Sequence, residues 1–168
     1  MKKCLPFPTS VRAVLVSAVL ITAALVTACS TGPVRRVSEP AASIQQLTVE
    51  ADGSWSIDLR VQNYSSIAMR FDHLQLEMQV NGEAAGSLQA SPQLQISQES
   101  ADVISVDLTP SAQARLLLAD ALAAGRGTGY RLEGTITAAP ADRGGSRDYR
   151  ITREGALSPM PGLPGVLR

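Results

Sequence analysis

Few side chains in this sequence are of the types that carry out acid–base or metal chemistry. His73 is the only histidine, and a general base or a metal ligand needs partner groups around it. Apolar and polar residues alternate from Leu74 to Val80, which predicts that His73 points to the polar face of a strand, away from Asp72. Two cysteines and one histidine also exclude most zinc sites and any disulfide framework. The sequence therefore predicts no catalytic residue, no metal and no cofactor, and His73 is interpreted as a surface residue.

A glycine-rich segment, Gly125 to Gly129, superficially resembles a phosphate-binding loop. A phosphate-binding loop leads into a helix and supplies a lysine, whereas this segment follows a predicted helix and contains no lysine. We interpret it as a helix C-cap followed by a flexible connection. Neither a Gly-x-Ser-x-Gly nor a His-Glu-x-x-His pattern occurs, so a hydrolase is disfavoured.

The thiol of Cys29 lies in a context that is typical of covalent modification. Three basic residues near the start precede sixteen uncharged residues, Ala13 to Ala28, a run at or below the length that spans a bilayer. The segment Leu25 to Cys29 looks like a bacterial lipobox, in which the cysteine sulfur receives a diacylglyceryl group and the new amino terminus is then acylated. We therefore expect residues 1–28 to be a lipoprotein signal peptide, cleaved between Ala28 and Cys29. An ordinary signal peptide or an uncleaved anchor is the alternative.

The residues after Cys29 bear on where such a lipoprotein would be held. Several acyl chains anchor a protein firmly without a transmembrane helix. Ser30 and Thr31 follow the cysteine, whereas lipoproteins of the inner membrane tend to have Asp there. The resemblance to lipoproteins thus implies a protein anchored by lipid in the outer membrane and facing the periplasm.

Charge excludes one class of partner. Removal of the leader with its three basic residues leaves twelve arginines against fifteen acidic residues, so the mature chain is mildly acidic. Nucleic-acid binding needs clustered basic side chains, so no nucleic-acid partner is expected. Arg143, Arg147, Arg150 and Arg153 cluster near the last predicted strand. They are interpreted as a solvated face. The alternative is that they contact anionic lipid or lipopolysaccharide phosphates together with Arg35 and Arg36.

Proline and glycine divide the mature chain into three parts. Residues 29–42 are predicted to be a flexible tether, residues 43–154 a globular domain, and residues 155–168 a Pro/Gly-rich tail without regular helix or strand. The tail also carries apolar residues, which disordered tails usually lack. It either lies along the domain and covers an apolar strip, or docks a partner through Pro161, Leu163 and Pro164.

Alternation with a period of two dominates the domain. The segment Trp55 to Val61 reads as a half-buried strand, and the apolar phase slips by one residue between Phe71 and Leu74, which predicts a β-bulge. Asp52-Gly53 and Asn81-Gly82 are hairpin turn signals. Trp55 is expected in the core, with an exposed sugar-stacking platform as the alternative.

One segment has helical spacing instead. Thr109 is the expected N-cap, Pro110 lies in the first turn, and Gly125 ends the helix, which spans about residues 110–124. Short strands separated by turn signals predict an all-β fold: an antiparallel β-sandwich of about seven strands with this one short helix inserted.

The domain contains, in this order, the segments Val61 to Tyr64, Leu74 to Gly82, Ser97 to Asp102 and Gly129 to Ile136. Their order is similar to that in the water-stress and hypersensitive-response (WHy) domain of the type 2 late-embryogenesis-abundant (LEA-2) family. Val61 to Tyr64 stands where the family has hydrophobic-x-Asn-Pro, with Tyr64 in place of Pro. Leu74 to Gly82 resembles the next strand and turn, Ser97 to Asp102 a polar lead into a strand, and Gly129 to Ile136 a Tyr-x-hydrophobic-x-Gly strand. The residues that carry the resemblance, all interpreted as structural, are Asn63, Tyr64, Asn81, Gly82, Tyr130 and Gly134.

The resemblance implies a fibronectin-III-like sandwich and a role without catalysis. The role that the resemblance implies is protection against desiccation, freezing or related stress. The expected function is thus a stress-protection or chaperone-like role for protein clients in the periplasm. The alternative is an interaction subunit of a cell-envelope complex that uses a sheet edge or the C-terminal tail.

Overall fold

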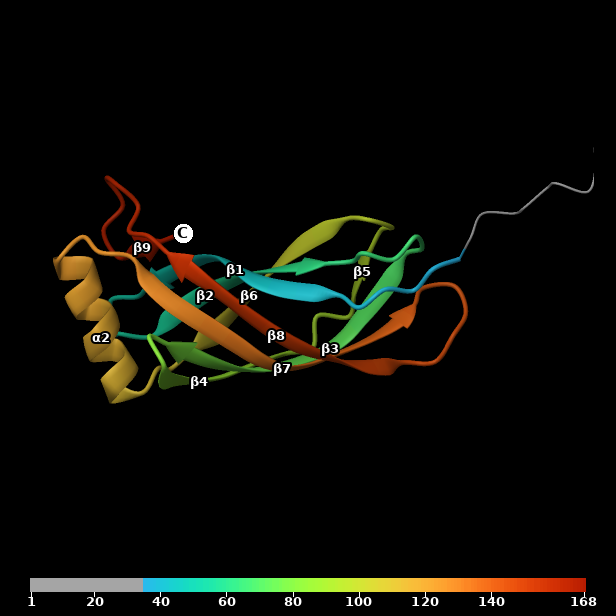
Figure 1. Ribbon diagram of the computed structural model, residues 1–168, viewed down its shortest axis with the longest axis horizontal. Coiled ribbons are helices and arrows are strands. Elements are labelled where there is room, and N and C mark those ends of the chain that lie inside the picture. Colours follow the sequence, from blue (N-terminus) through green and yellow to red (C-terminus); the bar gives the residue numbers. More distant parts are fainter. Residues whose placement is uncertain (1–34) are drawn as a thin grey trace, which may run out of the picture. The chain divides into compact units, whose positions relative to one another are not determined.

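Strands with one buried face make up most of the fold, as the alternating pattern predicted. In the computed structural model, which describes residues 35–168, nine strands and the helix α2 (Ala112–Ala123) follow one another (Figure 1). The strands are β1 (Ala41–Val49), β2 (Trp55–Gln62), β3 (Met69–Val80), β4 (Glu83–Ala90), β5 (Leu94–Ile96), β6 (Ala101–Leu108), β7 (Thr128–Pro140), β8 (Arg147–Leu157) and β9 (Val166–Leu167). The expected signal peptide, its cleavage point at Ala28 and the lipidation residue Cys29 lie outside the described residues. Within residues 35–168, no helix has the length and apolar character needed to span a membrane.

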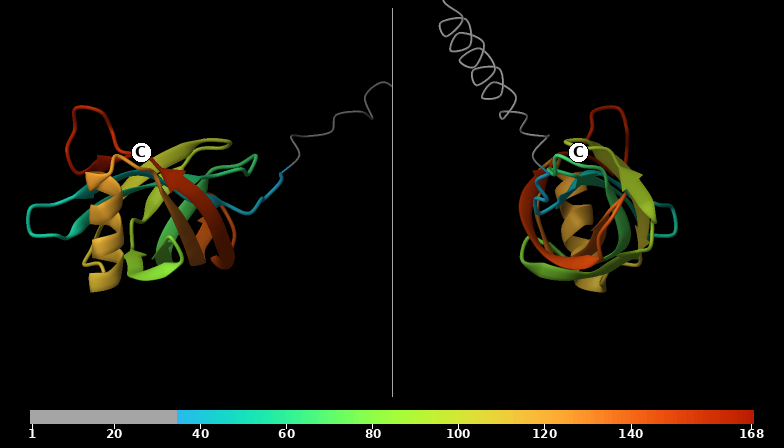
Figure 2. Two further views of the ribbon diagram at one scale, coloured as in Figure 1. Left: turned by 60° about the vertical axis from the view of Figure 1, so that its left-hand side comes forward. Right: turned by 90° about the vertical axis from the view of Figure 1, so that its right-hand side faces the viewer.

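Two antiparallel sheets form the domain, which confirms the all-β, sandwich-like fold. One sheet has the strand order β6-β2-β1-β9, and the other has the order β4-β3-β7-β8, with β5 also paired to β3. Seen end-on, the sheets curve around a common core, and α2 lies at one end of it (Figure 2). The expected number of about seven strands is too low, because the two short strands β5 and β9 also pair in the described part of the chain.

The predicted irregularities of the strands are present. The register of β3 against β7 shifts between Phe71 and His73, so that Phe71 and Leu74 both point into the core. At the β3–β4 hairpin, Asn81 and Gly82 have positive φ angles of 48° and 87°. A tight hairpin turn of type I′ requires positive φ at both central residues, which explains the Asn-Gly pair.

The helix begins later than predicted. Ser111, not Thr109, is the N-cap, and its hydroxyl oxygen accepts a hydrogen bond from the Ala114 amide at 3.2 Å. Its hydroxyl also donates to the Ala84 carbonyl at 2.7 Å, so contact with β4 favours this cap over the earlier one. Gly125 ends the helix as predicted: its φ is 62°, and the next amide bonds to the Ala121 carbonyl at 2.8 Å, as in a Schellman motif.

The core lies between the sheets and under α2. Trp55 is 1% exposed and packs with the buried set, which confirms its core interpretation. The largest fully buried side chains are Trp55, Leu47, Ile57, Leu59, Met69, Leu74, Leu76, Met78, Leu88, Leu118, Leu132 and Ile136.

Both ends of the domain extend beyond the predicted boundaries of residues 43 and 154. Residues 35–40, placed in the predicted tether, are hydrogen-bonded to loops of the domain, and β1 starts at Ala41. At the other end β8 continues to Leu157, and β9 pairs with β1 (Figure 1). The expectation that the tail has no strand is wrong, because Val166 and Leu167 pair with the edge of β1. Local sequence patterns do not show that this edge is available for pairing.

Candidate functional site

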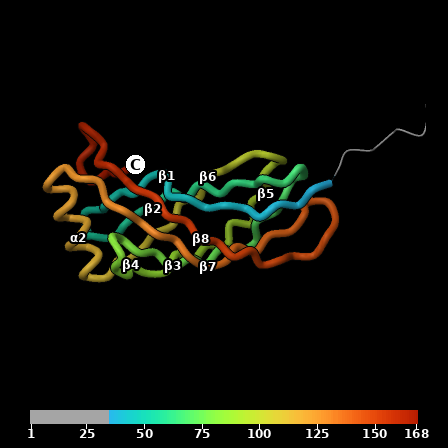
Figure 3. Tube along the Cα trace, viewed as in Figure 1, coloured from blue at the N-terminus to red at the C-terminus, as the bar shows by residue number. Residues whose placement is uncertain are grey.

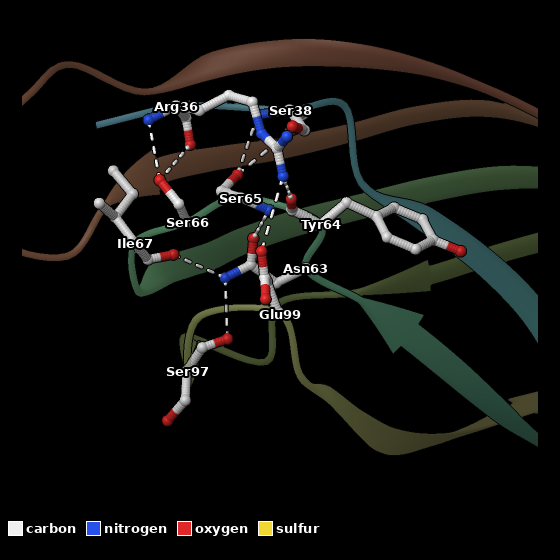
Figure 4. Close-up of polar contacts among 9 residues, drawn as sticks. All are labelled: Arg36, Ser38, Asn63, Tyr64, Ser65, Ser66, Ile67, Ser97 and Glu99. Carbon is white, nitrogen blue, oxygen red and sulfur yellow. Dashed lines mark hydrogen bonds and ion pairs between the residues drawn. The ribbon is translucent and has the colours of Figure 1, made fainter. Parts of the chain in front are cut away.

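Asn63 organises the loops at one end of the sandwich (Figure 4). Its side chain is buried just after β2, and the Nδ2 group donates to the carbonyl oxygens of Ile67 and Ser97 at 2.9 Å and of Ile96 at 3.2 Å. The Oδ1 atom accepts a hydrogen bond from the Ser65 amide at 2.9 Å. The amide thus ties the β2–β3 loop to the β5–β6 loop, which is the structural use of an asparagine at a strand end.

The same loop holds the first described residues of the chain. The Ser65 hydroxyl accepts a hydrogen bond from the Ser38 amide at 3.0 Å, and the Ser66 hydroxyl accepts one from the Arg36 amide at 2.9 Å. The Arg36 guanidinium lies 3.6 Å from the Glu99 carboxylate. The segment before β1 is therefore fastened along the Asn63 loop.

Tyr64 points away from this network (Figure 4). Its side chain is 47% exposed, while its neighbours Asn63 and Ser65 are 1% and 0% exposed. The buried neighbours fix the backbone, so the aromatic ring cannot turn into the core. Of the six residues that carry the family resemblance, Tyr64 is the one with a large exposed apolar surface.

Asn81 and Gly82 hold the opposite end of β3. The Asn81 Oδ1 atom accepts a hydrogen bond from the Gly129 amide at 2.9 Å, and the Asn81 amide donates to the Gly129 carbonyl at 2.9 Å. The β3–β4 turn is thereby locked to the start of β7. The glycine-rich segment thus supplies the predicted helix cap. The expected flexible connection is short, because Thr128 and Gly129 already belong to strand β7.

Tyr130 joins the two sheets. Its hydroxyl accepts a hydrogen bond from the Ile44 amide of β1 at 3.2 Å. The ring lies across Gly155 of β8, where an added Cβ would be 2.6 Å from the hydroxyl oxygen. Gly134 also permits a close approach, because a Cβ there would be 2.1 Å from the Gln75 carbonyl oxygen of β3. Both glycines therefore serve packing between strands.

His73 is placed on the surface, as predicted. Its Nδ1 atom lies 3.1 Å from the Ser91 hydroxyl oxygen. Within residues 35–168, no group of three or more His, Cys, Asp or Glu side chains is arranged to hold a metal ion.

The four clustered arginines, Arg143, Arg147, Arg150 and Arg153, are solvent-exposed, and none forms an ion pair within the described part of the chain.

Arg35 forms an ion pair with the β7–β8 loop. Its two guanidinium nitrogens donate to the Asp142 carboxylate at 2.6 and 2.7 Å. These hydrogen bonds lower the pKa of Asp142 to about 2. The pair attaches the first described residue to the β7–β8 loop.

The tail contains both buried and exposed apolar residues. Leu157 and Leu167 are buried, whereas Pro161, Leu163 and Pro164 are exposed. An open groove of about 490 Å³ separates the tail from α2, with Leu122 on one wall and Leu163 and Pro164 on the other. The tail therefore packs on the domain at its two ends and projects between them (Figure 1).

Some residues that matter here were not singled out from the sequence. Ser65 holds the chain before β1, and Gly155 accommodates the Tyr130 ring. Arg36 was considered only as a possible lipid contact, and its hydrogen bond to Ser66 was not predicted. A glycine in an alternating strand is a sequence signal of close approach and could have identified Gly155. The serine and arginine contacts join distant segments, so local patterns carry no signal for them.

Two solved structures are similar to parts of this chain. A crystal structure of a protein from Archaeoglobus fulgidus has 15% identity and a TM-score of 0.42, and the match covers 74% of this chain and 98% of that one. A solution structure of a protein from Arabidopsis thaliana has 14% identity and a TM-score of 0.46, with coverage of 75% and 81% respectively. No curated protein sequence matches the chain.

A family model described as late embryogenesis abundant protein matches residues 58–155. The match spans more than half of the 168 residues and contains all six residues that carried the resemblance. The chain therefore belongs to the late embryogenesis abundant LEA_2 family.

Proposed function

We propose that this protein is a lipid-anchored periplasmic member of the family with a non-catalytic stress-protection or chaperone-like role. The observation that carries the proposal is the family match over residues 58–155, since membership suggests a stress-related, non-catalytic role. The anchor rests on the lipobox-like segment that ends at Cys29, and the outer-membrane location on the residues after it.

The way the domain uses its polar groups supports a role in shielding unfolding proteins from one another. The polar family residues Asn63, Asn81 and Tyr130 hold backbone segments together. Asn81 and Tyr130 line one open pocket of about 410 Å³, whereas Asn63 lies at the opposite end of β3. Charges of both signs lie on the surface, as in the bridges that Arg131 makes to Glu133 and Glu154. A mixed polar surface held at high density near a membrane would keep unfolding proteins apart without binding them tightly.

Drying tests the protective role. A fragile enzyme is dried and rehydrated with the soluble fragment 30–168, which includes the whole described domain. An inert globular protein of equal mass is the control, because any added protein protects to some extent. Recovery of activity clearly beyond the control is expected, and recovery equal to the control would reject the protective role.

The anchor is tested separately. The mature chain should carry acyl groups on Cys29, visible as an increase in mass and as incorporation of labelled palmitate. The Cys29→Ser variant should lose both. A parent chain without added acyl mass would reject the anchor and leave the protective role standing.

A second candidate function is an interaction subunit, which the groove between α2 and the tail favours. Removal of residues 155–168 would not test it cleanly, because Leu157 and Leu167 are in the core. The Leu163→Asp variant changes the groove while leaving these two side chains in place. Crosslinking in cells should capture a partner with the parent and not with this variant, and Leu116→Asp, on an exposed position of α2, is the matched control.

A further inference from the structure

The chain leaves the described domain at a fixed place. Arg35 is held by the Asp142 carboxylate at 2.6 Å and by the Arg143 carbonyl at 2.8 Å. Arg36 is held by the Ser66 hydroxyl at 2.9 Å. These contacts fasten the chain between the β2–β3 and β7–β8 loops, so any segment that leads to Cys29 starts from this end of the sandwich (Figure 3).

The number of residues between Cys29 and Arg35 limits how far this end can be from an anchor. Cys29 precedes Arg35 by six residues, which reach at most about 20 Å when fully extended. Strand β3 has twelve residues and is about 40 Å long. Helix α2 and the tail lie at the far end of the sandwich (Figure 1). The end that carries Asn63 is therefore the one that the anchor holds close to the bilayer.

The surface of this end has the chemistry of a membrane–water interface. Tyr64 and Val37 are two of the five large apolar side chains that are exposed in the described residues, and both belong to the segments that meet here. The Arg36 guanidinium lies 3.5 Å from the Tyr64 carbonyl oxygen and 3.6 Å from the Glu99 carboxylate, and 62% of its side chain remains exposed. A tyrosine places its ring among apolar groups and its hydroxyl in water, and an arginine pairs with phosphate oxygens.

We propose that Tyr64, Val37 and Arg36 form a membrane-facing surface, and that the anchored domain stands on this end with its long axis away from the bilayer. The partner of this surface is the headgroup region of the membrane that holds the lipid of Cys29. This inference rests on the proposed lipid anchor. It also places the groove of α2 and the tail away from the membrane, where a protein client can reach it.

The native chain supplies one internal reporter for a test. Trp55 is the only tryptophan; it is buried at the start of β2, near Leu118 of α2, and so marks the far end. A Tyr64→Trp variant adds a reporter at the near end. A Leu116→Trp variant adds one at an exposed position of α2 and is the matched control.

The experiment uses the full lipidated chain in phosphatidylcholine–phosphatidylglycerol vesicles, with and without bromine on the upper acyl chains. Flotation first establishes that the parent chain is bound, and urea unfolding establishes that the variants are as stable as the parent. Bromine quenches tryptophan emission only at short range. Quenching severalfold stronger in Tyr64→Trp than in Leu116→Trp and in the parent is expected.

Each other outcome has a defined meaning. If the chains float with the vesicles but Tyr64→Trp is quenched no more than Leu116→Trp, the domain hangs free or lies on its side, and the inference is overturned while the anchor stands. If the parent chain does not float, the anchor itself is rejected and the inference falls with it.

Discussion

The amide of Asn63 provides the sharpest test of how the loops are held. The Asn63→Asp substitution keeps the side-chain shape and the oxygen that accepts a hydrogen bond from the Ser65 amide at 2.9 Å. It replaces the Nδ2 donor with an oxygen that faces the carbonyl oxygens of Ile67, Ile96 and Ser97. The variant therefore removes donors without creating a cavity.

The expected loss follows from the number of donors. The two N–H groups of the amide serve three carbonyl oxygens, so about two full hydrogen bonds disappear. Each buried polar group left unsatisfied costs about 1–3 kcal/mol, which lowers the free energy of unfolding by about 2–6 kcal/mol. Because a domain has only about 5–15 kcal/mol of stability, the effect is large.

The introduced carboxyl group also makes the loss depend on pH. Burial and the facing carbonyl dipoles disfavour the carboxylate, so its pKa in the folded state should rise above the ordinary value of about 3.9. Below that ordinary value the group is protonated in both states and can donate one hydrogen bond. As the pH rises towards the raised pKa, the unfolded state releases its proton first, and the variant becomes progressively less stable.

Urea unfolding followed by Trp55 fluorescence measures this, since Trp55 is buried in the core. The Asn63→Ala variant is the control, because it removes the donors without adding a titratable group. Asn63→Asp should be less destabilised at about pH 4 than at about pH 7, relative to Asn63→Ala. A loss below about 0.5 kcal/mol, or one with the same pH dependence as Asn63→Ala, would refute the reasoning.

Three further changes test separate contacts. The Leu167→Ala variant should lose about 2–5 kcal/mol of stability because it empties core volume at β9; an unchanged Tm in calorimetry would contradict a packed tail. The Tyr130→Phe variant should lose about 1–3 kcal/mol because the Ile44 amide loses its acceptor; urea unfolding identical to the parent would contradict this. The Arg35 hydrogen bonds lower the pKa of Asp142, so their stabilisation is present above the ordinary pKa and disappears as the pH falls through about 2. NMR titration of Arg35→Gln should show the Asp142 pKa moving up, and an unchanged value would exclude Arg35 as its cause.

Local patterns were enough to predict the type and order of most elements. The alternation around Trp55, the phase slip after Phe71 and the Asn81-Gly82 turn each depend on residues a few positions apart. Side-chain direction alternates along a strand, and only some residues tolerate positive φ. Strand and turn patterns can therefore be recognised within a few consecutive residues. The sequence by itself therefore determined an all-β fold with a helix that ends at Gly125.

Only the tertiary structure decided how distant segments satisfy one another. The Asn63 side-chain amide donates to the carbonyl oxygen of Ser97, and the Ile44 backbone amide donates to the Tyr130 hydroxyl. The last residues of the chain pair with β1. Ser111 replaces the expected helix cap because β4 offers it a carbonyl acceptor. These partners are set by which edges and backbone groups remain unpaired after the sheets have formed. Since that depends on the whole three-dimensional arrangement, no local pattern in the sequence encodes it.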